Sequence, residues 1–568
     1  MIKKTGACLM AALCALSMVA CGPTDSGDTT MIAIKNFDGG VGVSWLDGAM
    51  ERFKELKKDE VYESGKKGVS FAEPKNEQSA ATDSMATEGY HIYFLQGVDV
   101  RGLAQKGLLM DITDIVTQEL SVYGETKTIE DKIDANYRQM MRAGDGKYYG
   151  LPHYEYYPGF SYDVEHFENY NLYIAAEGED DVENHEAFGK TVAFCGRDYA
   201  AKKSCGNDGK YGTVDDGLPT SLMELLVLCD KMDNNGITPF TLSGQYIQYS
   251  NYIVQSLWSS LAGYDQMRVC YDFEGELDII TGWTGDNLFD GINYIEKPIV
   301  ETVSISKENN NQHLIYDQAA RYYAISFLQM IEKEGWFYKD ASSSAASHTT
   351  TQGNFIFNGK TVNGNVIPKI GMLCEGSYWY QESQRAENFT DYALLQNGKE
   401  KKIAWMSLPT SFDTTVTEGK GSSNILLETG AAYAYINNNI SGNAGLSRAC
   451  KEFLQFLYTD AELQTFTVKS GSAKAVSYEL TAKNKEAMDS FPLSIWELRN
   501  SSKIVYAGAT NEKFLKNPTA YLLKGTSLAF NPTFGQQTYK NFLTPIRAGK
   551  NAKELYEATL MTQTIWNQ

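Results

Sequence analysis

Apolar residues change their spacing repeatedly along the chain, from the period of a strand to the period of a helix. The stretch "MIAIKNF" (31–37) predicts a strand, and "SWLDGAMERFKELKKD" (44–59) predicts a helix because its apolar residues recur every three or four positions. Ser44, with Asp47 three residues later, predicts a capping box at the start of this helix. The same order of strand and helix returns in "YHIYFL" (90–95) and "VRGLAQKG" (100–107).

Longer helices are predicted over residues 221–236, 318–335 and 445–468, the last with a break near Thr459–Asp460. The helix over 221–236 has Ser221 and Glu224 as its start signal and Gly236 as its stop, and the strand "ITPFTL" (237–242) follows it. Polar stretches predict loops over 177–216, 341–354 and 410–424. Strands that alternate with helices over this length indicate parallel α/β sheets.

The size of the chain indicates more than one hydrophobic core. It has 568 residues, of which 43% are hydrophobic, and this is more than one core needs, so we expect two or more lobes. Beyond the N-terminus no stretch approaches eighteen consecutive apolar residues, which excludes a transporter with many membrane spans. Tyrosine is plentiful at 36 residues; large cores account for most of them, but a flat face with a polar tip also suits a partly wet ligand surface.

The N-terminus has the layout of a secretion signal. Lys3 and Lys4 precede an apolar run that ends at Cys21, and a polar, glycine-containing tail follows. The segment Ser17–Cys21 resembles a bacterial lipobox, with Met18 in place of the usual leucine. The resemblance implies a signal peptide over 1–20, a lipid on Cys21 and a lipidated linker over 21–30, on the outer face of the cytoplasmic membrane. An ordinary signal peptide that is cut nearby is the alternative.

Charge and cysteine content exclude some functions. The net charge is −20, and removal of Lys3 and Lys4 with the signal leaves 49 basic against 71 acidic residues, or −22, which argues against nucleic acid as the partner. Cys195 and Cys205 are close in sequence, so whether they form a disulfide stays open. No CxxC or HExxH motif occurs, so we expect no zinc site. The acidic cluster of Asp208, Asp215 and Asp216 lacks the ligand spacing of an EF-hand, which favours a solvated loop over a calcium site.

Four turns after predicted strands could hold a ligand, because open α/β sheets bind ligands beyond the carboxyl ends of their strands. They are "DGGVGVSW" (38–45), "LQGVD" (95–99), "PHYEYYPGF" (152–160) and "CEGSYWYQE" (374–382). Aromatic rings stack on the C–H face of a sugar, and carboxylates or amides bind its hydroxyls. The stacking candidates are Trp45, Tyr156, Trp258, Tyr378 and Trp379, and the hydroxyl-binding candidates are Gln96, Asp99, Glu155, Gln245 and Glu375. A core aromatic or a solvated carboxylate fits each single residue equally well.

Five stretches, taken in order, resemble the extracellular solute-binding lipoproteins of carbohydrate ABC importers, the class that includes maltose-binding protein. They are "MIAIKNFDGGVGVSWLDGAMERFKEL", "YHIYFLQGVDVRGLAQKGLLMDITDIV", "GKYYGLPHYEYYPGFSYDVEHFENYNL", "KIGMLCEGSYWYQES" and "AAYAYINNNISGNAGLSRACKEFLQFLYTDAELQTF". The resemblance carries over most directly to Asp99, Tyr378 and Trp379.

This resemblance implies a two-lobed periplasmic-binding-protein-like type II fold of the α/β class, with a sugar between the lobes. Lobe one would take 31–155 and 409–470, and lobe two would take 156–408 and 471–568. Crossovers would lie near 154–160, with a hinge at Pro158–Gly159, and also near Leu408–Pro409 and 471–476. A monomer without a cofactor would close on a carbohydrate ligand and present it to ABC permease subunits.

Other functions fit parts of the same pattern. A glycoside hydrolase needs two carboxyl groups about 5 to 9 Å apart, and Glu155 with Glu375 or Asp99 is such a pair of candidates. A surface lipoprotein that binds glycans without transport would share the anchor and the acidic body. A peptide or another solute could also replace the sugar, because the lobes alone do not select the ligand.

Overall fold

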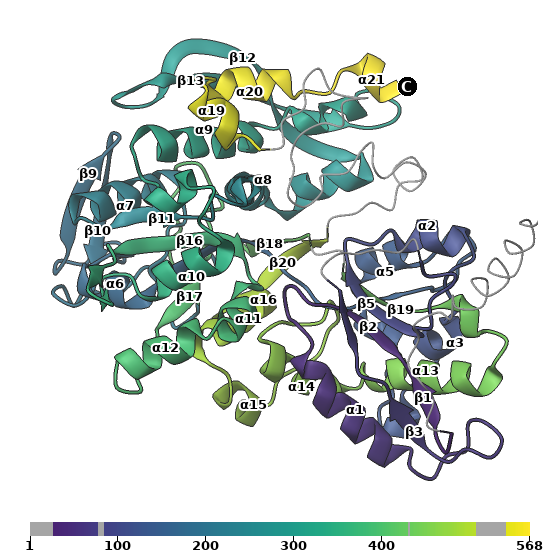
Figure 1. The fold of residues 1–568 in the computed structure, drawn as a ribbon. Helices are drawn as coiled ribbons and strands as arrows, with labels where there is room; N and C mark the ends of the chain where they lie inside the picture. The colour runs from purple at the N-terminus through teal and green to yellow at the C-terminus, as the bar shows by residue number, and fades with distance from the viewer. Residues whose placement is uncertain (1–26, 78–83, 430–431, 507–540, 568) are drawn as a thin grey trace, which may run out of the picture.

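The computed structural model describes residues 27–77, 84–429, 432–506 and 541–567, and these residues form two lobes (Figure 1). The predicted signal segment and Cys21 lie outside the described residues. In the part of the chain that is described, no helix combines the length and the apolar character that a membrane span requires.

Lobe one is built on a five-stranded sheet in the order β4-β2-β5-β19-β6. β2 pairs in parallel with β4 and β5, whereas β19, from late in the chain, is antiparallel to β5 and β6. These strands are β2 Ile34–Phe37, β4 Lys75–Glu77, β5 Ile92–Gln96, β6 Leu151–Pro152 and β19 Ala432–Ile436, and a separate parallel pair is formed by β1 Thr30–Ile32 and β3 Val69–Phe71. The predicted strand over 31–37 is therefore two short strands.

Helices cover both faces of the lobe-one sheet (Figure 1). They are α1 Ser44–Leu56, α2 Val100–Gln105, α3 Thr113–Thr117, α4 Ile129–Lys132, α5 Ala135–Met141, α13 Ala444–Phe456 and α14 Asp460–Ser470, with 3-10 turns η1 Ser121–Tyr123 and η5 Asn438–Ile440. α1 buries the apolar face that its sequence predicts, but Val43 is its N-cap and makes no side-chain cap, so the capping box of Ser44 and Asp47 is wrong. The predicted break before Asp460 is confirmed, because Thr459 caps α14.

Lobe two is built on a four-stranded sheet in the order β11-β16-β7-β17. β11 Thr238–Thr241 is parallel to β16 Ile370–Gly376, and β7 Pro158–Asp163 runs antiparallel to β16 and to β17 Ile403–Trp405. All residues of β7 and β16 are buried, as expected for strands that are covered on both faces.

The helices of lobe two surround this sheet. They are α6 Val164–Asn169, α7 Leu222–Asn234, α8 Ser250–Asp272, α9 Ala319–Lys333, α10 His348–Ile356, α11 Trp379–Arg385, α12 Asn388–Leu395 and α16 Ser490–Ser501, with 3-10 turns η2 Ile247–Tyr249, η3 Gln312–Tyr316 and η4 Lys339–Ser342. The short helix α15 Ala482–Glu486 packs instead on α14 of lobe one. The capping box of Ser221 and Glu224 at the start of α7 is confirmed. α8 is kinked at Gly263, whose φ of 77° interrupts the helix.

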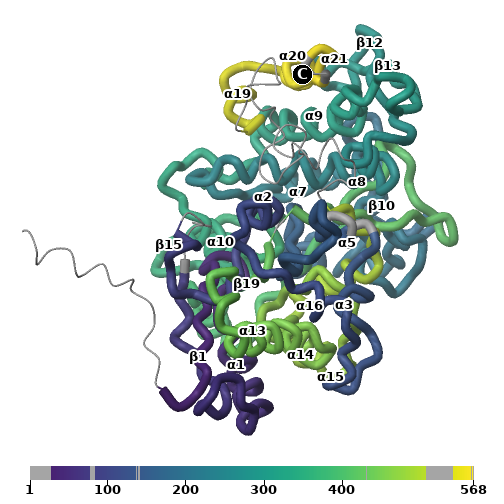
Figure 2. Tube along the Cα trace, turned by 90° about the vertical axis from the view of Figure 1, so that its right-hand side faces the viewer, coloured from purple at the N-terminus to yellow at the C-terminus, as the bar shows by residue number. Residues whose placement is uncertain are grey.

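Smaller sheets and three C-terminal helices complete lobe two. The strands are β8 Tyr173–Ile174, β9 Glu183–Ala187, β10 Lys190–Cys195, β12 Gly275–Phe289, β13 Ile292–Ile305, β14 Thr361–Val362, β15 Asn365–Val366, β18 Asn424–Glu428 and β20 Ser502–Tyr506. The helices α19 Leu543–Arg547, α20 Ala552–Ala558 and α21 Gln563–Asn567 lie beside the β12–β13 hairpin in both views (Figure 2).

Two of the three predicted loops contain regular structure. Residues 177–216 include the antiparallel pair β9–β10, in which polar and buried positions alternate. Residues 341–354 include the start of α10, because Ser347 caps this helix by accepting a hydrogen bond from the Thr350 amide. The stretch 410–424 has no helix or strand before β18, as predicted.

The chain passes between the lobes along neighbouring segments. Residues 153–157 connect β6 to β7, and the Glu155 amide donates to the Ala473 carbonyl at 2.9 Å, which joins this segment to the one that follows α14. The predicted passage near Leu408–Pro409 is placed differently. The Leu408 carbonyl accepts from Asn207 and Ser260 of lobe two, so the segment from 409 to the end of β18 belongs to lobe two, and the chain enters lobe one only before β19.

Candidate functional site

Polar and aromatic side chains from both lobes meet beside the first crossing segment. We call this group the interlobe cluster; it consists of Gln96, Tyr154, Tyr156, Tyr249, Tyr252, His348, Gln352, Glu375, Tyr378 and Glu382. Gln96 ends β5 of lobe one and Glu375 lies near the end of β16 of lobe two. The cluster therefore lies at the carboxyl ends of strands, where the fold class places ligands.

Tyrosine rings form one side of the cluster. Tyr156 and Tyr378 meet edge to face, with ring centroids 4.9 Å apart, and the hydroxyls of Tyr378 and Tyr252 are 3.4 Å apart. The rings of Tyr249 and Tyr252 are stacked at 5.2 Å. Burial raises the pKa of Tyr156 to about 12, while the polar groups of Tyr252 and Gln96 act in the opposite direction. The rings thus stay neutral at physiological pH and offer both flat faces and hydroxyl groups.

Glu382 connects this side of the cluster to lobe one. Its carboxylate accepts from the Gly40 amide at 3.3 Å and from Gln352 Nε2 at 3.1 Å, and His348 Nε2 lies 3.9 Å away. Burial raises the pKa of Glu382, and the nearby His348, Gln352, Gly40 and Arg385 oppose that rise. The side chain therefore bridges the glycine loop of lobe one and the helix α10 of lobe two.

Arg385 adds a second bridge between the lobes. Its guanidinium donates to the carbonyl oxygens of Gly40 at 3.1 Å and Asp38 at 3.2 Å. Gly40 and Gly42 both have positive φ, and a Cβ on Gly42 would overlap the Arg385 guanidinium. The glycines of this loop are needed both for the backbone conformation and for the close approach of Arg385. We call the contact of Arg385 and Glu382 with this loop the interlobe latch.

Glu375 is the most unusual member of the cluster. Its side chain is fully buried, and neither carboxyl oxygen has a hydrogen-bond partner in the described part of the chain. Burial raises its pKa well above the ordinary value and Glu382 raises it further. The Gln352 amide lies close enough to oppose these effects, although it does not reach Glu375 with the geometry of a hydrogen bond. Gln352 Oε1 and His348 Nδ1 are also buried without a partner among the described residues. Buried polar groups normally have hydrogen bonds, so this group is suited to bind a polar ligand.

Four of the ten residues predicted from the sequence meet in the interlobe cluster. They are Gln96, Tyr156, Glu375 and Tyr378, and the Tyr154 hydroxyl donates to Gln96 Oε1 at 2.6 Å. Gln245 is exposed and lies one residue before Tyr246, whose ring contacts His348. It is therefore at the edge of the cluster.

The three predicted tryptophans lie in hydrophobic cores. Trp45 packs on Phe94 and Phe466 of lobe one, and its Nε1 donates to the Gly42 carbonyl. Trp258 is 1% exposed and donates to Gln318, and Trp379 is fully buried and donates to Ser161 Oγ at 2.8 Å. In this structure none of the three rings presents a face to the cluster, because neighbouring side chains cover them.

The carboxylates of Asp99 and Glu155 have structural partners. Asp99 caps α2 by accepting from the Gly102 amide at 3.0 Å. Glu155 is bound by Arg499 Nε at 2.6 Å and by the Tyr506 hydroxyl at 2.9 Å, and it also accepts from the Tyr157 hydroxyl. Of the carboxylates proposed for a hydrolase, Glu155 and Asp99 are thus engaged in hydrogen bonds within the protein.

Several members of the cluster were missed by the sequence analysis. Tyr249 and Tyr252 follow β11 in "SGQYIQYSNY", a strand end rich in tyrosine that the same rule would have found. His348 and Gln352 are four residues apart on one face of α10, and the interpretation of 341–354 as a loop concealed that spacing.

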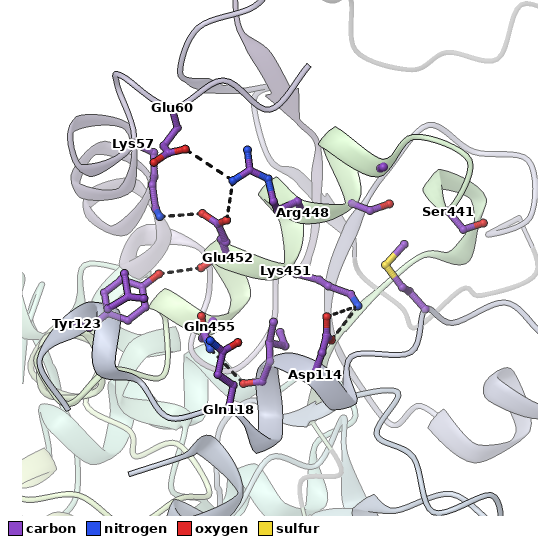
Figure 3. A pocket seen from close by; sticks show the side chains of 15 residues that line it. Lys57, Glu60, Asp114, Gln118, Tyr123, Ser441, Arg448, Lys451, Glu452 and Gln455 are labelled. Atoms are coloured by element: carbon purple, nitrogen blue, oxygen red, sulfur yellow. Dashed lines mark hydrogen bonds and ion pairs between the residues drawn. The ribbon is translucent and has the colours of Figure 1, made fainter. Parts of the chain in front are cut away.

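A separate groove of about 720 Å³ lies on lobe one, beside α3 and α13 (Figure 3). Its charged side chains bind one another: Lys451 is 2.8 Å from Asp114, and Lys57 is 2.7 Å from Glu452. Since these charges are already paired, the groove offers less to a polar ligand than the interlobe cluster does.

The cysteines and the acidic loop have structural roles. Cys195 and Cys205 are both buried free thiols. Asp215 is buried and accepts hydrogen bonds from the Asp208 amide at 3.1 Å and from Asn424 at 3.0 Å. Over the described residues, no group of three or more His, Cys, Asp or Glu side chains has the arrangement of a metal site.

Comparisons with known proteins give similarities at the level of structure only. No protein-family model and no curated protein matches the chain. A solved structure described as "Chitin oligosaccharide binding protein" has a TM-score of 0.47 and 16% identity, over 85% of this chain and 89% of that one. Another, "SBP RafE in complex with raffinose", has a TM-score of 0.46 and 12% identity, over 84% of this chain and 89% of that one.

Proposed function

We propose that the protein captures a sugar or oligosaccharide between its two lobes and delivers it, unaltered, to a membrane ABC permease. The observation that carries the proposal is the interlobe cluster, in which tyrosine rings lie beside buried polar groups that have no hydrogen-bond partner among the described residues. A pyranose has an apolar C–H face and a rim of hydroxyls, so it matches both halves of this chemistry.

The polar half of the cluster can bind several hydroxyl groups at once. In the described part of the chain, Glu375 and Gln352 together have three buried oxygen atoms without hydrogen-bond partners, and these atoms are available to the hydroxyl groups of a sugar. His348 Nδ1 is a fourth such atom. A buried polar group without a hydrogen bond destabilises the protein by about 1 to 3 kcal/mol. A ligand that hydrogen-bonds to such groups removes this destabilisation, and its affinity increases accordingly.

The interlobe latch supports a mechanism of closure. Arg385 and Glu382 of α11 bind the loop 38–42 of lobe one through backbone groups. A ligand that contacts both lobes favours the conformation in which this latch is formed, by the difference of its affinity for the closed and open states. The permease would then recognise the closed form.

The anchor belongs to the same proposal. A lipid on Cys21 would hold the protein on the outer face of the cytoplasmic membrane, and a linker of about nine residues would precede β1. Anchoring raises the effective concentration of the loaded protein near its permease without adding a contact. Mass spectrometry of the mature protein from a bacterial membrane fraction tests this, because a diacylated N-terminal cysteine has a defined mass.

A binding assay with product analysis tests the central function. Isothermal titration with a panel of mono- and oligosaccharides is expected to give saturable binding of at least one sugar, and chromatography of the mixture is expected to return that sugar unchanged. Tyr378→Ala should weaken binding roughly 10- to 100-fold, because it removes one ring of the cluster. The matched control is Tyr149→Ala. The hydroxyl of Tyr149 donates a hydrogen bond to Asp145 at the surface of lobe one. Shortened sugar products would support a glycoside hydrolase instead.

A further inference from the structure

The ligand class can be narrowed from the surroundings of Glu375. This carboxyl group is fully buried on β16, with both oxygens unpartnered in the described part of the chain. Gln352, also fully buried, directs its amide toward the acidic pair, since its Nε2 donates to Glu382 while its Oε1 has no partner among the described residues. Two independent buried groups thus point to a ligand at this place.

Among the described residues, no positively charged group acts on the pKa of Glu375. Besides burial, the groups that act on its pKa are Glu382 and Gln352, and neither of them is positively charged. Arg385 is committed to the carbonyl oxygens of Asp38 and Gly40. His348 lies 3.9 Å from Glu382. The two carboxyl groups therefore share a buried site, and His348 is the histidine whose ring approaches Glu382.

Tyrosine rings lie near Glu375. Burial raises the pKa of Tyr249, Tyr252 and Tyr378 first, and in each case the nearby Glu375 raises it further. The stacked pair of Tyr249 and Tyr252 and the edge-to-face pair of Tyr156 and Tyr378 line the same cluster. A tyrosine face attracts a cation, and a carboxyl group beside several such faces adds an acceptor for the N–H groups of an ammonium.

We propose that the interlobe cluster selects a sugar that carries a protonated amino group, with the ammonium placed against Glu375 and the tyrosine rings around it. The inference rests on the proposed function and names the ligand class of that same site. A neutral sugar would leave Glu375 either uncharged or unpaired, whereas an ammonium group supplies the missing cation and two or three hydrogen-bond donors.

Binding of an ammonium group should release protons, which can be measured. Burial raises the pKa of the Glu375 carboxyl well above its ordinary value, so the free protein favours the protonated carboxyl more than solvent does. Binding of an ammonium group favours the carboxylate, so the O–H proton passes to solvent and an N–H···O hydrogen bond forms in its place. Affinity for an amino sugar should therefore rise with pH across the range in which the amine stays charged. Glu382, His348, Tyr249, Tyr252 and Tyr378 are the other titratable groups that face this position.

The experiment compares matched sugars by isothermal titration at pH 6, in two buffers of different ionisation enthalpy. The probes are glucosamine oligosaccharides, their N-acetylated forms and glucose oligosaccharides of the same length. We expect the amino sugar to bind about 10- to 100-fold more tightly than the neutral forms, with a net release of protons on binding. Glu375→Gln keeps the shape of the side chain and should remove both the preference and the proton release, whereas the exposed Glu486→Gln should change neither.

The outcomes separate the inference from the proposed function. Equal or tighter binding of the neutral sugars would overturn the inference and leave sugar capture standing. Binding of simple polyamines without binding of any sugar would overturn the proposed function and the inference that rests on it. Proton release by the unaltered protein is measured without any variant, so a Glu375→Gln protein that failed to fold would still leave the proposal testable.

Discussion

The ion pair between Glu155 and Arg499 is expected to hold two crossing segments together. Arg499 Nε and Nη2 lie 2.6 and 3.1 Å from the carboxylate oxygens of Glu155, and Nη2 also donates to the Val476 carbonyl at 3.0 Å. The Glu155 side chain is fully buried, and that of Arg499 is 8% exposed. Replacement of Arg499 by Met therefore leaves a carboxylate in the interior without its cation.

The size of the effect follows from that burial. Breaking a buried pair from one side costs about 3 to 5 kcal/mol. The hydroxyl of Tyr506 remains bound to Glu155 at 2.9 Å, and Tyr157 also donates to it, so the lower end of the range is expected for Arg499→Met. A loss of about 3 kcal/mol should appear as a shift of the urea midpoint followed by tryptophan fluorescence.

A matched control separates burial from charge. Arg547→Met breaks an ion pair with Glu332 whose side chains are 23% and 25% exposed, and about 1 kcal/mol or less is expected because solvent screens it. The double variant Glu155→Gln with Arg499→Met should recover part of the loss, since no unpaired charge remains. If Arg499→Met shifts the midpoint no more than Arg547→Met does, the reasoning that the crossing segments depend on this pair is refuted.

Three further predictions concern the core, a buried amine and the latch. Trp379→Ala should lower the free energy of unfolding by about 3 to 5 kcal/mol, because the ring is fully buried. The sugar dissociation constant of the folded protein should stay unchanged. A loss of affinity at constant Tm would contradict this. Burial lowers the pKa of Lys474 from 10.5 to about 7. Between these two pH values the unfolded chain binds more protons than the folded one, so the free energy of unfolding rises with pH. Below pH 7 the full cost of burying the charged amine is present. Lys474→Met should therefore stabilise the protein by about 5 kcal/mol at pH 6 and much less at pH 10, as measured by thermal unfolding. An equal gain at both pH values would exclude this origin. Gly42→Ala should weaken sugar binding about 10-fold by displacing Arg385 from the latch, while Gly398→Ala, at a similar positive φ but in open space, should have no effect on Kd.

The elements that follow from local pattern could be predicted from the sequence. The buried face of α1, the capping box of α7 and the break before α14 all depend on residues within a few positions of one another. The passage between the lobes near Leu408 could not be placed, because it depends on contacts of Leu408 with Asn207 and Ser260, which are distant in sequence.

The turns that form the site could be predicted from the sequence more easily than the individual side chains that point into it. The rule of strand ends located the turns after β5 and β16, and Gln96, Glu375 and Tyr378 came from them. The same rule misassigned Trp379, because adjacent residues at the start of α11 point to different surroundings: Tyr378 meets Tyr156 and Tyr252, whereas Trp379 packs on Phe389 and Phe491. Sequence alone does not distinguish these two directions at a helix start.

Hydrogen–deuterium exchange with and without a bound sugar tests most directly whether the ligand lies between the lobes. Slower exchange is expected in both lobes at once, in the glycine loop 38–42 of lobe one and in 247–255 and 372–385 of lobe two, since these segments form the interlobe latch and cluster. Protection restricted to one lobe, or to the groove beside α3 and α13, would contradict the account.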